Sequence, residues 1–213
     1  MKTSDLVTML ARGDPRLGLF PVGRRFALTI VIGFACSTLL LTAVFGVRSD
    51  MPALLERPIF WMKVAFPLFV LSAALLLTLR LSRPGGRTTA AWIFLLFPVF
   101  IIWLVGIVVV VNAPSALRLP LMVGTTWRTC TLSIAALSVP PFIAIFWTMK
   151  DMVSTRPMLA GAVIGLLSGA QGAVLYSFYC VEMAIPFWAI WYVLGILMPT
   201  VPGILLGRIV LLW

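Results

Sequence analysis

The sequence predicts an all-α fold, a polytopic bundle of six transmembrane helices. Of the 213 residues, 62% are hydrophobic and only 10% are charged, and the mean hydropathy is +1.14. A soluble domain carries about a quarter charged residues, so lipid is the expected solvent of most of this chain. A helix needs about 20 apolar residues to cross a ~30 Å hydrocarbon core. Six such passes therefore use nearly the whole length and leave no room for a separate soluble domain.

Six apolar runs supply these passes. Unpaired backbone groups find no partner in lipid, so runs of this length are expected to be helices rather than strands. About 25 residues precede the first run and no small-x-small site follows it, which distinguishes it from a cleaved signal peptide. The expected spans, in order, are Phe26–Val47, Ile59–Leu79, Ala91–Val111, Thr125–Met149, Met158–Tyr179 and Phe187–Gly207.

Proline and glycine mark the joints between the spans. The second and third spans are separated by RLSRPGGRTT, in which Pro84, Gly85 and Gly86 are strong helix breakers. Pro157 is expected to start the fifth helix, where its missing N–H leaves no bond unmade. Prolines within the spans are expected to kink their helices; they are Pro67, Pro98, Pro140, Pro141, Pro199 and Pro202.

The basic residues predict the orientation. Eleven Lys and Arg fall on one side of the alternating connections and five on the other. Because Lys and Arg concentrate in cytoplasmic loops, both termini are expected in the cytoplasm. The eleven are Lys2, Arg12, Arg16, Arg24, Arg25, Arg80, Arg83, Arg87, Lys150, Arg156 and Arg208, and the five are Arg48, Arg57, Lys63, Arg118 and Arg128.

The net charge of +10 raises the question of nucleic-acid binding. A phosphate-binding patch needs basic side chains clustered on one exposed face, whereas these cations are scattered between apolar runs. Contact with the anionic head groups of the lipid bilayer is their expected role. No direct binding of nucleic acid is expected.

The residues that catalysis needs are scarce. The chain contains no His, which removes the commonest general base and metal ligand. No P-loop or GxGxxG motif occurs, and the acidic residues all lie in tails or connections, so no buried carboxylate pair is expected. We therefore expect no catalytic residues, no cofactor and no enzymatic activity. The six acids are Asp5, Asp14, Asp50, Glu56, Asp151 and Glu182.

The fifth span carries a glycine strip. Gly161, Gly165 and Gly169 recur every four residues and so lie along one helical face, where small residues let helices approach closely. Helix packing is therefore their expected role. Further along the same helix, Tyr176 and Cys180 fall close to the face of Gly169, which predicts that the cysteine points toward a neighbouring helix.

The three cysteines are separated by the predicted topology. Cys36 lies near the middle of the first span, where a lone thiol behaves as a small apolar residue. Cys130 and Cys180 lie toward the outer face, at the start of the fourth span and the end of the fifth. They form either a thiol switch or soft-metal site, if their Cα atoms come within about 7 Å, or two unrelated buried thiols.

Three charged residues lie near the same outer edge. Lys63, Arg128 and Glu182 could tune the thiolate character of the cysteines by charge. For Lys63 and Arg128 we favour the alternative that their side chains extend to the lipid head groups. Arg128 is two positions from Cys130, so on a helix the two side chains diverge.

The N-terminal tail, residues 1–25, is the one sizeable cytoplasmic piece expected, and it precedes a transmembrane domain of residues 26–213. Thr3 or Ser4 could cap a short helix that ends at Gly13 and Pro15. An apolar stripe on so short a helix needs a partner, either the membrane surface or another protein. The stripe consists of Leu6, Val7, Met9 and Leu10.

Several short stretches occur in a definite order along the whole chain. They are TSDL near the N-terminus, GRRF before the first span, FWMKVAF in the second, TWRTC and LSVPP in the fourth, TRPMLAGAVIGLLSGAQGAVLYSFYC in the fifth and WYVLGILMP in the last. In their order and spacing the chain resembles the NrsF-type family of bacterial anti-sigma factors, six-helix proteins of the inner membrane.

This resemblance implies a function. The cytoplasmic N-terminal segment of such a protein holds an extracytoplasmic-function sigma factor at the membrane, away from RNA polymerase. Two outward-facing cysteines respond to oxidants or heavy metals, and they map onto Cys130 and Cys180. The candidate sigma contacts in the tail are Thr3, Asp5, Leu6 and Leu10. Relatives tend to place a His before the second cysteine where Tyr179 stands here, which favours plain thiol chemistry over a His-assisted metal site.

The working hypothesis is a two-state switch, in which oxidation or metal capture at the cysteines repacks two helices and changes how the tail is presented. A small transporter or channel is one alternative, but Gln171, Thr148 and Ser133 are a thin supply of polar groups at mid-depth, and no internal repeat is evident. A membrane thiol oxidoreductase is another. It would need a second cysteine pair, whereas one further cysteine is present.

Overall fold

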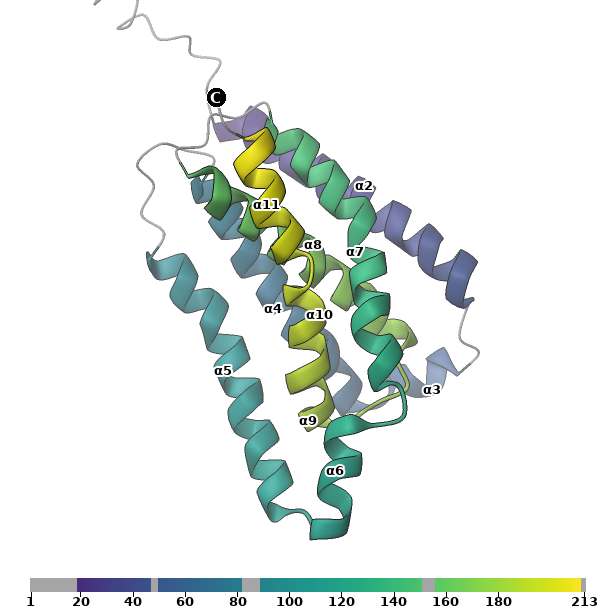
Figure 1. Cartoon of the computed structure of the whole chain (residues 1–213). Helices are drawn as coiled ribbons and strands as arrows, with labels where there is room; N and C mark the ends of the chain where they lie inside the picture. The colour runs from purple at the N-terminus through teal and green to yellow at the C-terminus, as the bar shows by residue number, and fades with distance from the viewer. Residues whose placement is uncertain (1–18, 47–49, 82–88, 151–155, 212–213) are drawn as a thin grey trace, which may run out of the picture.

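The computed structural model describes residues 19–46, 50–81, 89–150 and 156–211. These residues are helical apart from short connections, and no strand occurs among them. Six helical segments in the described ranges are long and apolar enough to cross a membrane. The predicted all-α bundle of six spans is therefore confirmed (Figure 1).

The first three spans are single long helices. They are α2 (Leu19–Phe45), α4 (Pro58–Leu81) and α5 (Thr89–Asn112), and a short helix α3 (Met51–Leu55) joins the first two. The span prediction omitted α3, because five residues are too few to produce a hydropathy signal of their own.

The fourth span is one long helix close to the predicted Thr125–Met149, whereas the sixth span is divided, and there the predicted single helix was wrong. A separate helix α6 (Ser115–Val123) precedes α7 (Trp127–Lys150), and a turn at Gly124 separates them. Gly124 has φ +58, a conformation that favours glycine. After α8 (Pro157–Tyr179), which Pro157 starts as expected, the last span runs through α9 (Ile185–Phe187), the π-helix η2 (Trp188–Tyr192), α10 (Val193–Leu197) and α11 (Thr200–Val210).

Helix α8 is the centre of the bundle and packs against α2, α4, α7, α10 and α11 (Figure 1). Its glycines make these contacts close. A Cβ at Gly161, Gly165 or Gly169 would collide with backbone atoms of Gly203, Pro199 or Ile196 respectively. The glycine strip therefore lies directly against the last span, where α8 meets α10 and α11 with almost no side chain between the backbones.

Helix α2 lies at the edge of the bundle and is joined to α7 and α8 by polar contacts. Ser37 Oγ donates a hydrogen bond to the Leu137 carbonyl (2.7 Å), which Pro141 leaves without its usual helical partner. Thr29 and Thr148 share a hydroxyl hydrogen bond (2.7 Å). Thr148, one of the polar groups considered for a transport path, thus makes a contact between helices.

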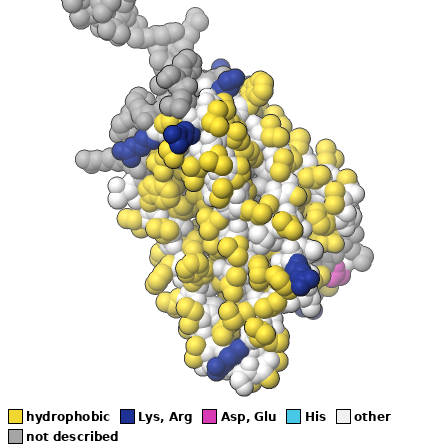
Figure 2. Space-filling view, viewed as in Figure 1, with side chains coloured by type: hydrophobic (Ala, Val, Ile, Leu, Met, Phe, Trp, Pro, Cys, Tyr) yellow, Lys and Arg dark blue, Asp and Glu magenta, His cyan; other side chains and the backbone are white. Residues whose placement is uncertain are grey.

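The bundle has two chemically different ends. The tail end contains the start of α2 and the end of α11, and the cysteine end contains the starts of α4 and α7 and the end of α8. Figure 2 shows hydrophobic side chains over most of the visible face, with Lys and Arg toward its two ends. The described basic residues of the tail end are Arg24, Arg25, Arg80, Lys150, Arg156 and Arg208, and the described acids, Asp50, Glu56 and Glu182, all belong to the cysteine end.

Candidate functional site

The structure brings Cys130 and Cys180 together in one buried site. Cys130 lies in the first turn of α7, and Cys180 is the residue at which α8 ends. Both are free thiols, 0% and 2% exposed, and their side chains lie close enough to interact. Cys36, in contrast, is exposed on the outside of α2. The pair is therefore a single chemical site rather than two unrelated thiols.

The end of α8 determines the geometry at Cys180. The Cys180 N–H still donates to the Tyr176 carbonyl (2.9 Å), but its own backbone is extended, with φ −63 and ψ 127. The following residues, 181–184, form no helix. Carbonyl groups of this connection are consequently left outside any helical hydrogen-bond ladder and must find other donors.

Lys63 supplies those hydrogen bonds. Its Nζ donates to the carbonyls of Cys180 (2.6 Å) and Glu182 (2.9 Å) and lies 5.9 Å from the centre of the Tyr192 ring. The side chain is 0% exposed, so the prediction that it extends to the lipid head groups was wrong. The acceptors that draw it inward come from a connection 117 residues away, which local sequence cannot reveal.

Glu182 holds the same connection, residues 181–184, through further hydrogen bonds. Its Oε1 accepts hydrogen bonds from the Thr125 N–H (2.7 Å) and hydroxyl (2.6 Å), and its carbonyl accepts a further bond from Trp188 Nε1 (3.1 Å). Its carboxylate is thus directed to the turn before α7 rather than to the thiols. Arg128 is exposed, with its guanidinium carbon 5.0 Å from the centre of the Trp127 ring.

Two tyrosines complete the surroundings of the thiols. Tyr176 and Tyr192 are 2% and 0% exposed, and their ring centres are 6.2 Å apart. The Tyr192 hydroxyl is buried without a hydrogen-bond partner among the described residues. Tyr176 also contacts Phe45 at the end of α2, with ring centres 6.4 Å apart. The thiol site is therefore connected to α2 through an aromatic pair.

The electrostatics distinguish the two sulfurs. Interaction with the Cys130 thiol and the positive charge of Lys63 lower the pKa of Cys180, with the Glu182 backbone adding to them, while burial opposes this shift. A thiolate is the reactive form of cysteine. Cys180 is therefore the sulfur of the pair that ionises first.

The donor set bears on metal binding. Across the described ranges, no three His, Cys, Asp or Glu side chains lie close enough to hold a metal ion together. Cys130 and Cys180 therefore offer two sulfur ligands. Two adjacent thiols suit reversible disulfide formation or linear capture of a soft cation.

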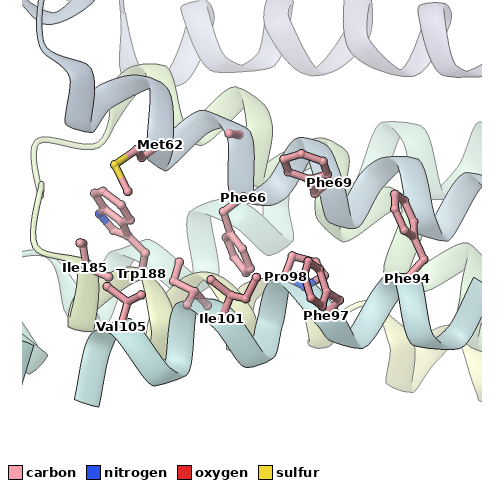
Figure 3. A pocket seen from close by; sticks show the side chains of 12 residues that line it. Met62, Phe66, Phe69, Phe94, Phe97, Pro98, Ile101, Val105, Ile185 and Trp188 are labelled. Carbon is pink, nitrogen blue, oxygen red and sulfur yellow. The ribbon is translucent and has the colours of Figure 1, made fainter. Parts of the chain in front are cut away.

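One apolar pocket contains neither cysteine in its lining. It lies between α4 and α5, has a volume of about 300 Å³, and reaches Trp188 (Figure 3). Its lining contains no charged side chain, so it offers no group for chemistry. Helix α5 is exposed along much of its length, and the pocket is best described as a groove facing lipid.

The predicted tail contacts, Thr3, Asp5, Leu6 and Leu10, lie outside the described residues. The site residue that sequence reasoning misjudged is Lys63, and a signal for it was present. A single charge inside the apolar run FWMKVAF is unusual, because ionisable groups within spans pair with interior partners and mark functional sites.

Comparison with known proteins identifies the family. A family model described as NrsF, negative regulator of sigma F, matches residues 10–213. The chain belongs to the NrsF family. It is 43% identical over 213 residues to the "Probable anti-sigma-F factor NrsF" of Azospira oryzae and 34% identical over 215 residues to the "Anti-sigma-F factor NrsF" of Caulobacter vibrioides, covering all of each chain in both cases. No solved structure matches the chain.

These findings confirm the resemblance drawn from the ordered sequence stretches. The relatives in this family are named as anti-sigma factors, which are regulators rather than enzymes. The buried thiol pair is therefore to be interpreted as part of a regulatory membrane protein.

Proposed function

We propose that this chain is a membrane anti-sigma factor that holds an extracytoplasmic-function sigma factor through residues 1–25 and releases it when Cys130 and Cys180 react. Membership of the NrsF family and the names of the two relatives support the anti-sigma role. The observation that carries the sensing step is the meeting of two thiols in one buried site. Oxidants and heavy metals are the stresses to which such a pair responds.

The charge distribution supports the orientation that this function requires. The tail end has six described basic residues and none of the described acids. The positive-inside rule then assigns this end, and the tail that leads into α2, to the cytoplasm of a bacterial inner membrane. The cysteine end faces the periplasm, an oxidising compartment in which a thiol pair can serve as a sensor.

The chemistry needs no further protein group. With a peroxide as oxidant, the Cys180 thiolate attacks one peroxide oxygen and the O–O bond breaks. Hydroxide is the leaving group, and Cys180 becomes a sulfenic acid. The Cys130 thiol then attacks that sulfur, a disulfide forms, and water leaves. Two electrons pass from the thiols to the peroxide. A soft divalent cation instead binds both sulfurs as thiolates, and any proton still on a thiol is released to water.

Coupling to the tail runs through α2. The helices that carry the two cysteines both contact it: α7 through the Leu137 carbonyl, and α8 through Gln171, whose Nε2 donates to the Ile30 carbonyl (2.8 Å). A covalent bond between the sulfurs alters the spacing of α7 and α8 and hence the surface on which α2 rests. Modest repacking is enough, because a short tail that orders on binding loses part of its interaction energy to ordering.

Co-purification of the sigma factor from membranes tests the proposal. Removal of residues 1–18, which precede α2, is expected to abolish co-purification and to leave a sigma-dependent reporter fully active. The double variant Cys130→Ser/Cys180→Ser is expected to keep the sigma factor bound under peroxide or soft-metal stress, and Cys36→Ser is the matched control. Retention of the sigma factor by the tail-deleted chain would show that the tail is not its binding segment.

A further inference from the structure

The groove between α4 and α5 is concave, with a floor and two walls. Its floor consists of the buried side chains of Phe66, Ile102 and Trp188. Figure 3 shows Met62 toward one end of the groove and Phe94 toward the other. A molecule lying in the groove is therefore contacted on three sides. The walls are large apolar side chains, between 41% and 61% exposed: Met62, Phe69, Phe94, Phe97 and Ile101.

The groove has the length and depth of one membrane leaflet. It extends from Met62 to Phe69 along α4, about 10 Å, and from Phe94 to Val105 along α5, about 16 Å, at 1.5 Å of rise per residue. Half of a hydrocarbon core is ~15 Å deep. Helix α4 begins at the cysteine end, and the groove occupies the half of α4 nearest that end. The groove therefore crosses the leaflet that adjoins the cysteine end.

The chemistry and width of the groove limit what can occupy it. The described residues that line it carry no charge, and the Trp188 indole N–H donates to the Glu182 carbonyl, so water there would lack hydrogen-bond partners. A helix with its side chains is about 10–12 Å wide, too wide to enter between two helices packed against each other. An empty groove of about 300 Å³ would forfeit dispersion contacts along its whole lining. A single hydrocarbon chain satisfies all three conditions.

We propose that this groove binds one acyl chain of a phospholipid from the leaflet at the cysteine end. Lipid tails are as apolar as the lining, so the hydrophobic effect does not favour this contact over any other. Van der Waals packing on three sides of the chain favours it instead. Arg57, exposed at the residue before α4, adds a positive charge at the level of the phosphate head group. Lipid binding at the groove is independent of the proposed sensing function.

The bound chain contacts residues that hold the connection after α8. Trp188, in the groove floor, donates to the Glu182 carbonyl (3.1 Å), which also accepts a bond from Lys63 (2.9 Å). Ile185, the first residue of α9, lines the groove directly after residues 181–184. The lipid therefore supports this connection from the membrane side, and its removal is expected to lower the thermal stability of the protein.

Two phenylalanines of α5 give a matched pair for the first arm of the test. Phe97 forms a wall of the groove and Phe100 lies outside it, and they are 61% and 65% exposed. The full-length chain and the variants Phe97→Ala and Phe100→Ala are extracted from membranes and purified in detergent. Bound phospholipid is counted by native mass spectrometry and by phosphate analysis. A further variant, Ala65→Phe, fills the groove from α4.

The parent chain and Phe100→Ala are each expected to retain one phospholipid. In Phe97→Ala and Ala65→Phe we expect the occupancy to fall about fivefold or more, because contacts with the chain are lost. Equal retention by Phe97→Ala and Phe100→Ala overturns the proposal, and so does a parent chain that retains only detergent. The phenylalanine pair keeps this power if Ala65→Phe fails to fold, since both side chains are largely exposed.

The second arm locates the chain in a bilayer. The full-length protein is placed in vesicles of phosphatidylethanolamine and phosphatidylglycerol, with a small fraction of phosphatidylglycerol that carries a diazirine midway along one acyl chain. After irradiation, labelled residues are identified by mass spectrometry. Labelling of Phe66 and Ile101 is expected to exceed that of Phe100 and Leu104, which are exposed outside the groove, and Ala65→Phe is expected to remove the excess. Uniform labelling along α5 that Ala65→Phe leaves unchanged would show exchangeable surrounding lipid alone and overturn the proposal.

Discussion

Helices α8 and α2 cross the bundle side by side but are held in opposite ways. In the most apolar stretch of each, 83% of the residues of α8 are buried and 17% of those of α2. Helix α8 is locked by backbone contacts at several glycines, whereas α2 packs along one face, closely at Gly33 and Phe26, and adds a few hydrogen bonds. Interhelical hydrogen bonds in membranes contribute on average about 0.6 kcal/mol each. Helix α8 is therefore packed on all sides within the bundle, and α2 is packed on one face only.

The largest expected loss of stability comes from disrupting a glycine contact between α8 and α11. Gly165→Leu places a side chain against the backbone of Pro199 and Thr200, and backbone cannot move aside without separating α8 from α11. We expect the free energy of unfolding to fall by more than about 3 kcal/mol, measured by thermal unfolding in detergent with size-exclusion detection. Gly23→Leu on α2 is the matched control, because a Cβ there meets nothing within 4 Å. Equal losses for both variants would contradict the comparison.

Displacing α2 is expected to reduce stability less than the Gly165 substitution does. It is expected to have a clear effect on repression of the sigma factor. A Cβ at Gly33 would lie 2.8 Å from Pro141 Cβ and 2.9 Å from Gln171 Nε2, so Gly33→Leu pushes α2 away from α7 and α8. We expect a loss of about 1–2 kcal/mol with the bundle intact, and sigma-dependent reporter activity without any inducer. A folded variant that still represses the reporter would show that the position of α2 does not control the tail.

Removing one polar link of α2 is expected to have a modest effect. Ser37→Ala leaves the Leu137 carbonyl without its donor, and about 0.5–1.5 kcal/mol of stability should be lost. Thr38→Ala is the control, since its hydroxyl bonds to Phe34 of its own helix and is exposed. The two variants are compared by thermal unfolding and by the peroxide dose that releases the sigma factor. A similar shift for Thr38→Ala would mean that the link to α7 has no special role.

The smallest effect is expected at Cys36, the exposed thiol of α2. Cys36→Ser should change stability by less than about 0.5 kcal/mol and leave the peroxide response intact. The same replacement at Cys130 or Cys180 should abolish the response, because either sulfur alone cannot close the disulfide. Sigma release in membranes measures both. A lost response in Cys36→Ser would move the sensor from the buried pair to α2.

The spans were predictable because membrane crossing depends on local hydropathy, which sums along each segment. The same local reasoning predicted the glycine strip on α8 as a packing face, and the packing partner, near Gly203 and Pro199, emerged only from the structure. The division of the last span into α9, η2, α10 and α11 escaped prediction, because an apolar run has the same hydropathy whether its helix is continuous or broken.

The candidate site was only half predictable. Cys130 and Cys180 were candidates from topology, which places them at one end of the bundle, but topology alone left open whether they meet. Lys63 was assigned to the lipid head groups because its position near the end of a span allows that. Its inward direction depends on carbonyls released where α8 ends, and that end meets α4 only in the folded bundle.

By itself, the sequence determined how many times the chain can cross a membrane, which end has the excess of basic residues, and which thiols lie at the opposite end, because these properties add up residue by residue. Only the tertiary structure decided that two thiols and a lysine share one buried site and that α2 lies at the edge of the bundle. Both depend on which helix faces which neighbour, and therefore on contacts between residues far apart in the chain.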